Sequence, residues 1–370
     1  MLAEQRHLGA SKTRGALAKS INCSKITHRM CRGTKSAGAL VLLATIGVAS
    51  VAPAAAARPS RWVRPAVDYL DRRHYFDEDQ FEGNRTMSRS RFRSLMRKAF
   101  GGAHLKRTKG RVTAGEVSRA LVKALERNHI ARTLRRARSP NGWMPSKPKY
   151  FGTEIVAREL GLRHDRPVSQ EDYEASATEP MRQADIAWAV WRAKTRPALY
   201  SADALAGFKL SNYGPSKRAM VNFALSLVGK PYVWAGEWTK RTGRRYPYGA
   251  QEHGGFDCSG FIWYVLKKKN SVYRPVDRHY EGWKIGQRSA ADMAAATRRR
   301  ISYRKLRPGD IVFFAPRGRK SRARTVYHAG IYLGRGWMVH SSASRAGVSL
   351  ADISRNSWWH GQIAWGRRVI

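Results

Sequence analysis

The sequence predicts an α+β protein, with a mostly helical N-terminal half and a C-terminal half in which strands follow one amphipathic helix. Apolar residues recur at helical spacing in several segments before residue 230. Short runs typical of strands occupy residues 310–314, 328–333, 337–341 and 362–365. Hydrophobic residues make up 42% of the 370 positions, which is a globular composition with room for two ordinary domains.

Residues 1–57 are predicted to be a secretory signal. Residues 37–57 are almost wholly apolar, follow a basic stretch, and end in alanines that offer an A-x-A cleavage site before Arg58. Met30 is an alternative start that would give the signal ordinary proportions. A retained transmembrane anchor is the alternative to cleavage, and Pro53 argues against it. We therefore expect a secreted or cell-wall-associated protein with no stable membrane insertion once the signal is cleaved.

Residues 58–205 are predicted to form a helical region that contains a weak internal repeat. The segments MSRSRFRSLMRKA (87–99), VTAGEVSRALVKA (112–124) and MRQADIAWAVWRA (181–193) align without gaps. In each, a short polar opening precedes apolar residues at helical spacing. We expect a capping Ser or Thr to begin the first two helices, whereas the third has arginine in that place.

Over residues 70–195 this repeat weakly resembles the S-layer homology module, a helical unit that holds exported proteins on the cell wall in groups of three. The resemblance implies a wall-binding region, and an unrelated small helical bundle is the alternative. A further helix is predicted over residues 154–162. Residues 139–149 and 196–216 are predicted to be loops or linkers.

The C-terminal domain is predicted over residues 206–370. Its first element is an amphipathic helix that opens at Ser216 and stops at Gly229. The predicted strands follow after residue 300, so helix and sheet are segregated along the chain, as in an α+β domain.

The charge of the chain is extreme, because 70 Lys and Arg face 26 Asp and Glu, for a formal net charge of +44. Such a charge implies an anionic partner or surface. For an exported protein the obvious polyanions are cell-wall polymers and lipid headgroups, and nucleic acid is a minor alternative that we do not expect.

Cys258 is the single cysteine downstream of the predicted signal, and it lies in the string GGFDCSGFIWYVL. A lone cysteine in an exported protein forms no internal disulfide, so a reactive thiol is one interpretation. The glycines and Asp257 before it, and the apolar run after it, place its sulfur at the first turn of a helix, where a thiolate is favoured. A buried structural thiol is the alternative.

Two histidines lie in a predicted hairpin, YHAGIYLGRGWMVHSS. A three-residue turn at 334–336 would pair Leu333 with Trp337. In that register His328 and His340 share one face of the sheet as diagonal neighbours, within reach of each other. A bulge in the turn would shift the register and remove this contact.

The blocks PYVWAGE, FDCSGF, LRPGDIVFF, HAGIYLG and MVHSS, in that order, resemble the NlpC-type papain-like cysteine peptidases of bacterial cell walls over residues 216–370. The resemblance implies a papain-like fold in which the nucleophile begins a helix packed on an antiparallel sheet. It implies that Cys258 is the nucleophile, His328 the general base and His340 the residue that orients the base. It further implies that Tyr232 lines the active-site wall.

By the same resemblance, Asp257 and Ser259 contact polar groups of the substrate peptide. The family cuts peptide stems of peptidoglycan, often at the γ-D-glutamyl–diaminopimelate bond, through an acyl-enzyme. An N-acetylmuramoyl-L-alanine amidase of the same fold and a non-catalytic wall-binding or surface-layer protein are the alternatives. A zinc site is a further reading of one cysteine and two histidines, but no fourth ligand lies at metal spacing, so we expect neither metal nor cofactor.

Two basic segments depart from the family pattern. Residues 237–255 form an insertion that could be a groove wall, a lid or a solvated loop. Residues 316–327 carry five Lys or Arg just before His328, which predicts a positive mouth for the cleft unless the run is only a solvated face.

Overall fold

The computed structural model describes residues 59–76, 81–164, 174–242, 251, 253–267 and 285–369. The predicted signal lies outside these residues, as do residues 243–250 and 252 of the insertion at 237–255. Residues Ala55–Ile370 form one compact unit, and the domain boundary at residue 206 stays a prediction. None of the helices in the described ranges combines the length and the apolar character that a membrane span requires.

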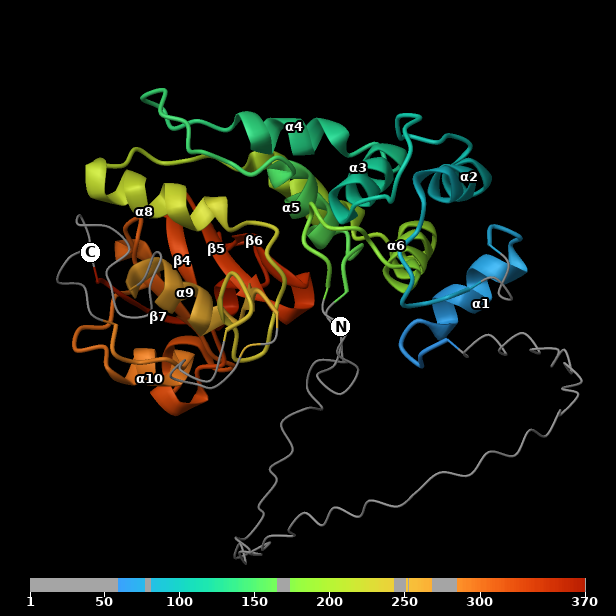
Figure 1. The fold of residues 1–370 in the computed structure, drawn as a ribbon. Helices are drawn as coiled ribbons and strands as arrows, with labels where there is room; N and C mark the ends of the chain where they lie inside the picture. The colour runs from blue at the N-terminus through green and yellow to red at the C-terminus, as the bar shows by residue number, and fades with distance from the viewer. Residues whose placement is uncertain are drawn as a thin grey trace, which may run out of the picture. The chain divides into compact units, whose positions relative to one another are not determined.

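The N-terminal part of this unit is helical, as predicted (Figure 1). Its helices are α1 (Arg64–Arg72), α2 (Arg89–Phe100), α3 (Ala114–Ala124), α4 (Asn128–Arg136), α5 (Phe151–Glu159), α6 (Gln183–Thr195) and α7 (Leu199–Ala204). The predicted loop at 139–149 contains neither helix nor strand, which confirms that prediction. The predicted loop at 196–216 is wrong in part, because α7 and a short 3₁₀ turn lie within it.

The three aligned segments begin helices α2, α3 and α6, and the expected caps are present. Ser88 Oγ accepts the backbone N–H of Arg91 at 3.2 Å. Thr113 and Glu116 form a reciprocal capping box, in which each side chain accepts the other's backbone N–H. Arg182 provides no side-chain cap for α6.

The first residues of the three segments form a closed ring of backbone hydrogen bonds. Met87 donates to Met181, Met181 to Val112, and Val112 to Met87, at 2.9–3.2 Å. Each repeat therefore pairs with both of the others, in a pseudo-threefold arrangement. The internal repeat of the sequence corresponds to a repeated structural unit, and its likeness to S-layer homology modules stays a prediction.

The C-terminal part contains a five-stranded antiparallel sheet in the order β6-β5-β4-β3-β7. Its strands are β3 (Ile311–Phe314), β4 (His328–Gly334), β5 (Trp337–Ser342), β6 (Gly347–Asp352) and β7 (Ile363–Arg367). Helices α8 (Pro215–Ser226) and α9 (Cys258–Lys267) pack on each other, and α9 packs on β4 and β5 (Figure 1). Helix α10 (Ala290–Ala295) precedes the sheet. The α+β prediction is therefore confirmed, with β6 as a strand that the sequence did not reveal.

Helix α8 does not open at Ser216 as predicted. It begins at Pro215, with Gly214 as its N-cap. Proline suits the first helical position because its missing N–H would have no partner there and its φ is already helical.

The hairpin prediction is correct in the strands and wrong at the turn. Tyr332 pairs with Met338 in the predicted register, but a register shift follows, and Gly334 rather than Leu333 pairs with Trp337. The turn therefore has two residues, Arg335 and Gly336, both with positive φ, as a type I′ turn requires. The bulge at Leu333 absorbs the extra residue, so the histidine end of the hairpin keeps its predicted register.

Arg158 of α5 joins the helical part to the C-terminal part. Its fully buried guanidinium donates to the backbone oxygen atoms of Gly229, at 3.0 Å, and of Ala346. It also lies within 3.4 Å of the carboxylates of Glu154 and Glu174. Burying a charge is unfavourable unless hydrogen bonds and opposite charges compensate it, so the contacts of this arginine fix α5 against strand β6, which begins at Gly347.

Candidate active site

Cys258 is the first residue of helix α9 and is partly buried. Asp257 caps this helix, because its Oδ1 accepts the backbone N–H of Gly260 at 2.6 Å. The sulfur accepts hydrogen bonds from the backbone N–H groups of Ser259 and Ala329. Ala329 follows His328 in strand β4, so the helix start and the histidine strand meet at the sulfur.

His328 and His340 are both buried and lie in contact, as their shared face predicted. The Nε2 of His328 and the Nδ1 of His340 are 2.7 Å apart. If His328 carries its proton on Nε2, it donates to His340 and keeps Nδ1 free to accept a proton. Trp359 packs against both rings, with centroids 4.9 Å from His328 and 5.4 Å from His340. The tryptophan restricts the orientation of the pair and excludes water from one side of it.

The resting site favours neutral groups, which corrects the expectation of a thiolate at the helix start. Burial, followed by the carboxylate of Asp257, raises the pKa of the Cys258 thiol to about 12. The two N–H groups and the guanidinium of Arg288 lower that pKa, but by less. Burial also lowers the pKa of His328 to about 3 and that of His340 well below its usual value. Transfer of the thiol proton to His328 therefore depends on the two groups becoming charged together, since each charge stabilises the other.

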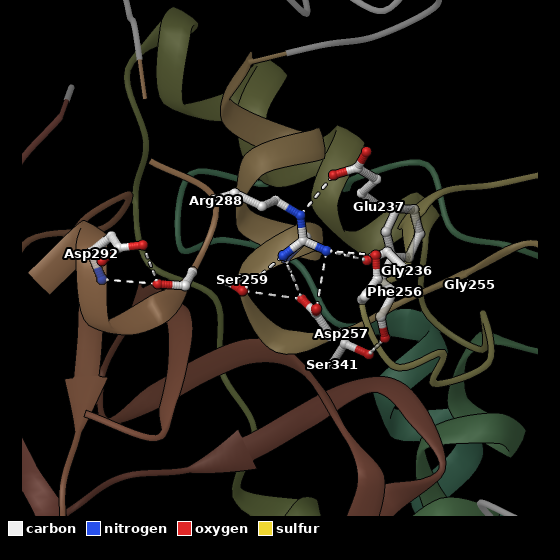
Figure 2. A network of polar contacts seen from close by, with 12 residues as sticks. Gly236, Glu237, Gly255, Phe256, Asp257, Ser259, Arg288, Asp292 and Ser341 are labelled. Atoms are coloured by element: carbon white, nitrogen blue, oxygen red, sulfur yellow. Dashed lines mark hydrogen bonds and ion pairs between the residues drawn. The ribbon is translucent and has the colours of Figure 1, made fainter. Parts of the chain in front are cut away.

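Arg288 is a central residue of the site that sequence reasoning missed. Figure 2 shows its guanidinium between the carboxylates of Glu237 and Asp257. Its Nε donates to Glu237 at 2.7 Å, and its two terminal nitrogens each donate to Asp257 at 3.0 Å. It also donates to Ser259 Oγ at 2.9 Å and to the backbone oxygen of Ala235 at 2.8 Å. One arginine among 70 basic residues gives no signal in the sequence.

All three residues expected to bind substrate have contacts within the protein. Asp257 bonds to Arg288 and to the helix start, and the Ser259 hydroxyl donates to Asp257 at 3.1 Å. Tyr232 is partly buried, donates its backbone N–H to Ala346, and forms a parallel bridge with Phe256. Tyr232 therefore lies beside the segment that leads to Cys258, and the substrate roles of all three residues stay predictions.

The two basic segments differ in how they are anchored. Strands β1 (Glu237–Trp238) and β2 (Gly255–Phe256) pair at the base of the insertion, and the side chain of Gln251 bonds to the backbone of both. Residues 243–250 and 252, the rest of the insertion, lie outside the described residues. In the segment 316–327 all five basic residues are exposed. This segment runs from the end of β3 to His328, so its charge lies next to the site in the chain.

Residues 229–367 match the model of the NlpC/P60 family. The chain is 33% identical over 145 residues to the protein named Probable peptidoglycan endopeptidase LytE from Bacillus subtilis, covering 38% of this chain and 30% of that protein. It is 27% identical over 139 residues to the Gamma-DL-glutamyl hydrolase of the same organism, covering 38% of this chain and 26% of that protein.

A solved NlpC/P60 family protein from Bacillus cereus is 24% identical, with a TM-score of 0.31, and the match covers 42% of this chain and 41% of that one. The chain thus spans less than half the length of each of these proteins. The match to the NlpC/P60 family lies in the part of the chain that holds the sulfur and the two histidines.

Proposed function

From the NlpC/P60 domain at residues 229–367, we propose that this chain is an exported peptidoglycan hydrolase that cleaves amide bonds in the peptide stems by a Cys-His-His acyl-enzyme mechanism. The observation that carries the proposal is that the structure brings the sulfur of Cys258 and the imidazoles of His328 and His340 together in one place. The Cys258 sulfur contacts the backbone beside His328, and His328 is bonded to His340. A nucleophile, a base and a residue that orients the base are the parts that covalent acyl transfer requires.

In the proposed reaction the Cys258 sulfur attacks the amide carbon while its proton moves to Nδ1 of His328. The contact with His340 stabilises the resulting imidazolium through the Nε2 proton. The oxyanion that forms can be received by the backbone N–H of Cys258, which belongs to the unpaired groups at a helix N-terminus. His328 then protonates the leaving nitrogen as the carbon–nitrogen bond breaks. Water hydrolyses the thioester, which releases the acid and restores the thiol.

The bond that we favour is γ-D-glutamyl–diaminopimelate. The proposal is supported by the relative named Gamma-DL-glutamyl hydrolase, although that protein is only 27% identical over the matched residues. An amide bond between lactyl and L-alanine, cut by an amidase of the same fold, is the competing choice. The basic segments beside the site suit an anionic wall.

Digestion of purified peptidoglycan by the wild type and by Cys258→Ala, with mass spectrometry of the new termini, tests the function. We expect new free amines on diaminopimelate with the wild type, and a loss of at least about 10³-fold with the variant. New lactyl termini would instead indicate the amidase. If neither protein gives products but both bind the wall, the chain is a non-catalytic wall-binding protein and the hydrolase proposal fails. Equal melting temperatures of the two proteins show that the loss is chemical rather than structural.

A further inference from the structure

A groove of about 1490 Å³ lies in the C-terminal part, between the segment that connects α10 to β3 and the end of β7. Its fifteen lining residues, all from the described part of the chain, include eight Lys or Arg and no Asp or Glu. Six of the eight come from residues 298–307, and the others are Arg367 and Arg368. We call this surface the basic groove.

Little of the positive charge in the basic groove is neutralised. Among the described residues, the carboxylate that pairs with it is Asp310, which accepts two hydrogen bonds from Arg368 at 2.8 and 2.9 Å. The three consecutive arginines at 298–300 are exposed. The guanidinium of Arg300 lies 3.7 Å from the ring centroid of Trp365, which fixes its position without removing its charge.

Holding these positive charges close together is unfavourable, and burial makes the charged form of Arg367 less favourable still, because it lowers the pKa of this arginine. Like charges held together in one concave surface repel one another, and a bound anion relieves that repulsion. The groove is therefore arranged for an anionic ligand that carries several charges.

The basic groove is separate from the cysteine site. Strand β3 pairs with both regions: Ile311 at its start faces Arg367, and Phe314 at its end faces His328. These two ends are about 10 Å apart at the usual rise of a strand. A ligand in the groove would thus bind beside the catalytic cleft without occupying it.

We propose that the basic groove binds a phosphodiester-linked wall polymer. Each phosphodiester carries one negative charge on two non-bridging oxygen atoms, which an arginine can bind through two parallel hydrogen bonds, and successive units of a polymer can place such groups along the arginines at 298–300. Seven of the eight basic residues are arginine, whose planar donors match phosphate. The choice of a wall polymer rather than nucleic acid rests on the proposed function, which places the protein at peptidoglycan.

Binding is measured on the full chain carrying Cys258→Ala, so that no hydrolysis occurs and the result does not depend on the peptidase activity. The probe is fluorescently labelled poly(glycerol phosphate), titrated by anisotropy at several salt concentrations. The groove variant is Arg298→Gln/Arg299→Gln/Arg304→Gln. The matched control is Lys98→Gln/Lys106→Gln/Arg107→Gln, which removes three exposed charges from the helical part.

We expect the groove variant to bind at least about tenfold more weakly and to lower the salt slope by about 2, if each lost contact contributes as it does with single-stranded nucleic acids. The control variant should change affinity less than about twofold, as expected of distant screened charges. Equal losses in both variants would show that net charge alone drives binding and would overturn the site. Equal affinity for polyglutamate would overturn the phosphate assignment, and tighter binding of an oligonucleotide of equal charge would assign the groove to nucleic acid instead.

Discussion

Replacing Arg288 by methionine should destabilise the protein strongly, because the arginine is the shared partner of the buried carboxylate of Glu237 and the largely buried carboxylate of Asp257. The side chains of Arg288, Glu237 and Asp257 are 6%, 3% and 13% exposed. Methionine fills a similar space but leaves both carboxylates without their cation. Removing one partner of a buried ion pair costs about 3–5 kcal/mol, whereas an exposed pair contributes about 0–1 kcal/mol.

Urea denaturation followed by tryptophan fluorescence measures this loss. The matched control is Arg85→Met, which makes the same chemical change at an ion pair whose side chains are 61% and 53% exposed. The double variant Arg288→Met/Asp257→Asn should recover part of the stability, since it removes one uncompensated charge. A loss below about 1 kcal/mol for Arg288→Met, equal to that of the control, would refute the view that burial makes this pair important.

The same variant has a second measurable effect, at the thiol of Cys258. Arg288 lowers the pKa of Cys258 and Asp257 raises it. With methionine at position 288 the carboxylate of Asp257 still raises the pKa of the Cys258 thiol, but the guanidinium that lowered it is gone. The thiol should therefore be less ionised, and iodoacetamide should alkylate Cys258 more slowly at a fixed pH above 8. Faster alkylation in a protein that is still folded would contradict this electrostatic role.

Two further predictions concern the histidine pair. In Gly330→Ala the new Cβ would lie 2.7 Å from Met338 Sδ and 3.2 Å from His340 Cβ, so we expect a loss of about 1–3 kcal/mol and reduced activity, whereas Gly361→Ala, which has open space, should be neutral. Normal activity in a stable Gly330→Ala protein would show that the position of His340 does not matter. Both histidines have a lowered pKa in the folded state, so their contribution to stability is complete above the unfolded value of 6.5 and falls as pH drops toward the folded value, about 3 for His328. Between pH 6 and 4 the free energy of unfolding of the wild type should fall by up to about 1.4 kcal/mol per pH unit for each histidine, measured relative to the variant His328→Gln/His340→Gln. Curves of unfolding free energy against pH that run parallel for the two proteins would contradict this.

The sequence predicted the features that depend on local pattern. The caps at Ser88 and Thr113 follow from residue type and spacing, and the two histidines come together because a hairpin fixes its own register. Arg288 could not be predicted in the same way. Its acidic partners lie 31 and 51 residues away, and only the fold brings them together.

Burial is the other property that local pattern does not contain. The position of Cys258 at a helix start was correct, but its neutral thiol results from packing against strand β4 and from the neighbouring Asp257. The two-residue turn at Arg335 and Gly336 was missed for a related reason, since a bulge at Leu333 supplied the difference of one residue. Strand β6 was not predicted from its own sequence, and it is identified by its pairing with β5 in the structure.

The buried Arg158 of helix α5 also has a consequence for the order in which the parts of the chain can fold. Its acceptor at Ala346 lies 188 residues further along the chain. At a synthesis rate of about 5–20 residues per second, the arginine waits roughly 10–40 s before that acceptor exists. Until then, of the partners named above, the guanidinium lacks the backbone acceptors of the C-terminal part and has only the carboxylates of Glu154 and Glu174, so the helical part cannot complete the contacts of this arginine in advance. The sheet that carries the two histidines and the helix that carries Arg158 must therefore finish folding together, which makes formation of the His328–His340 contact a late step in folding.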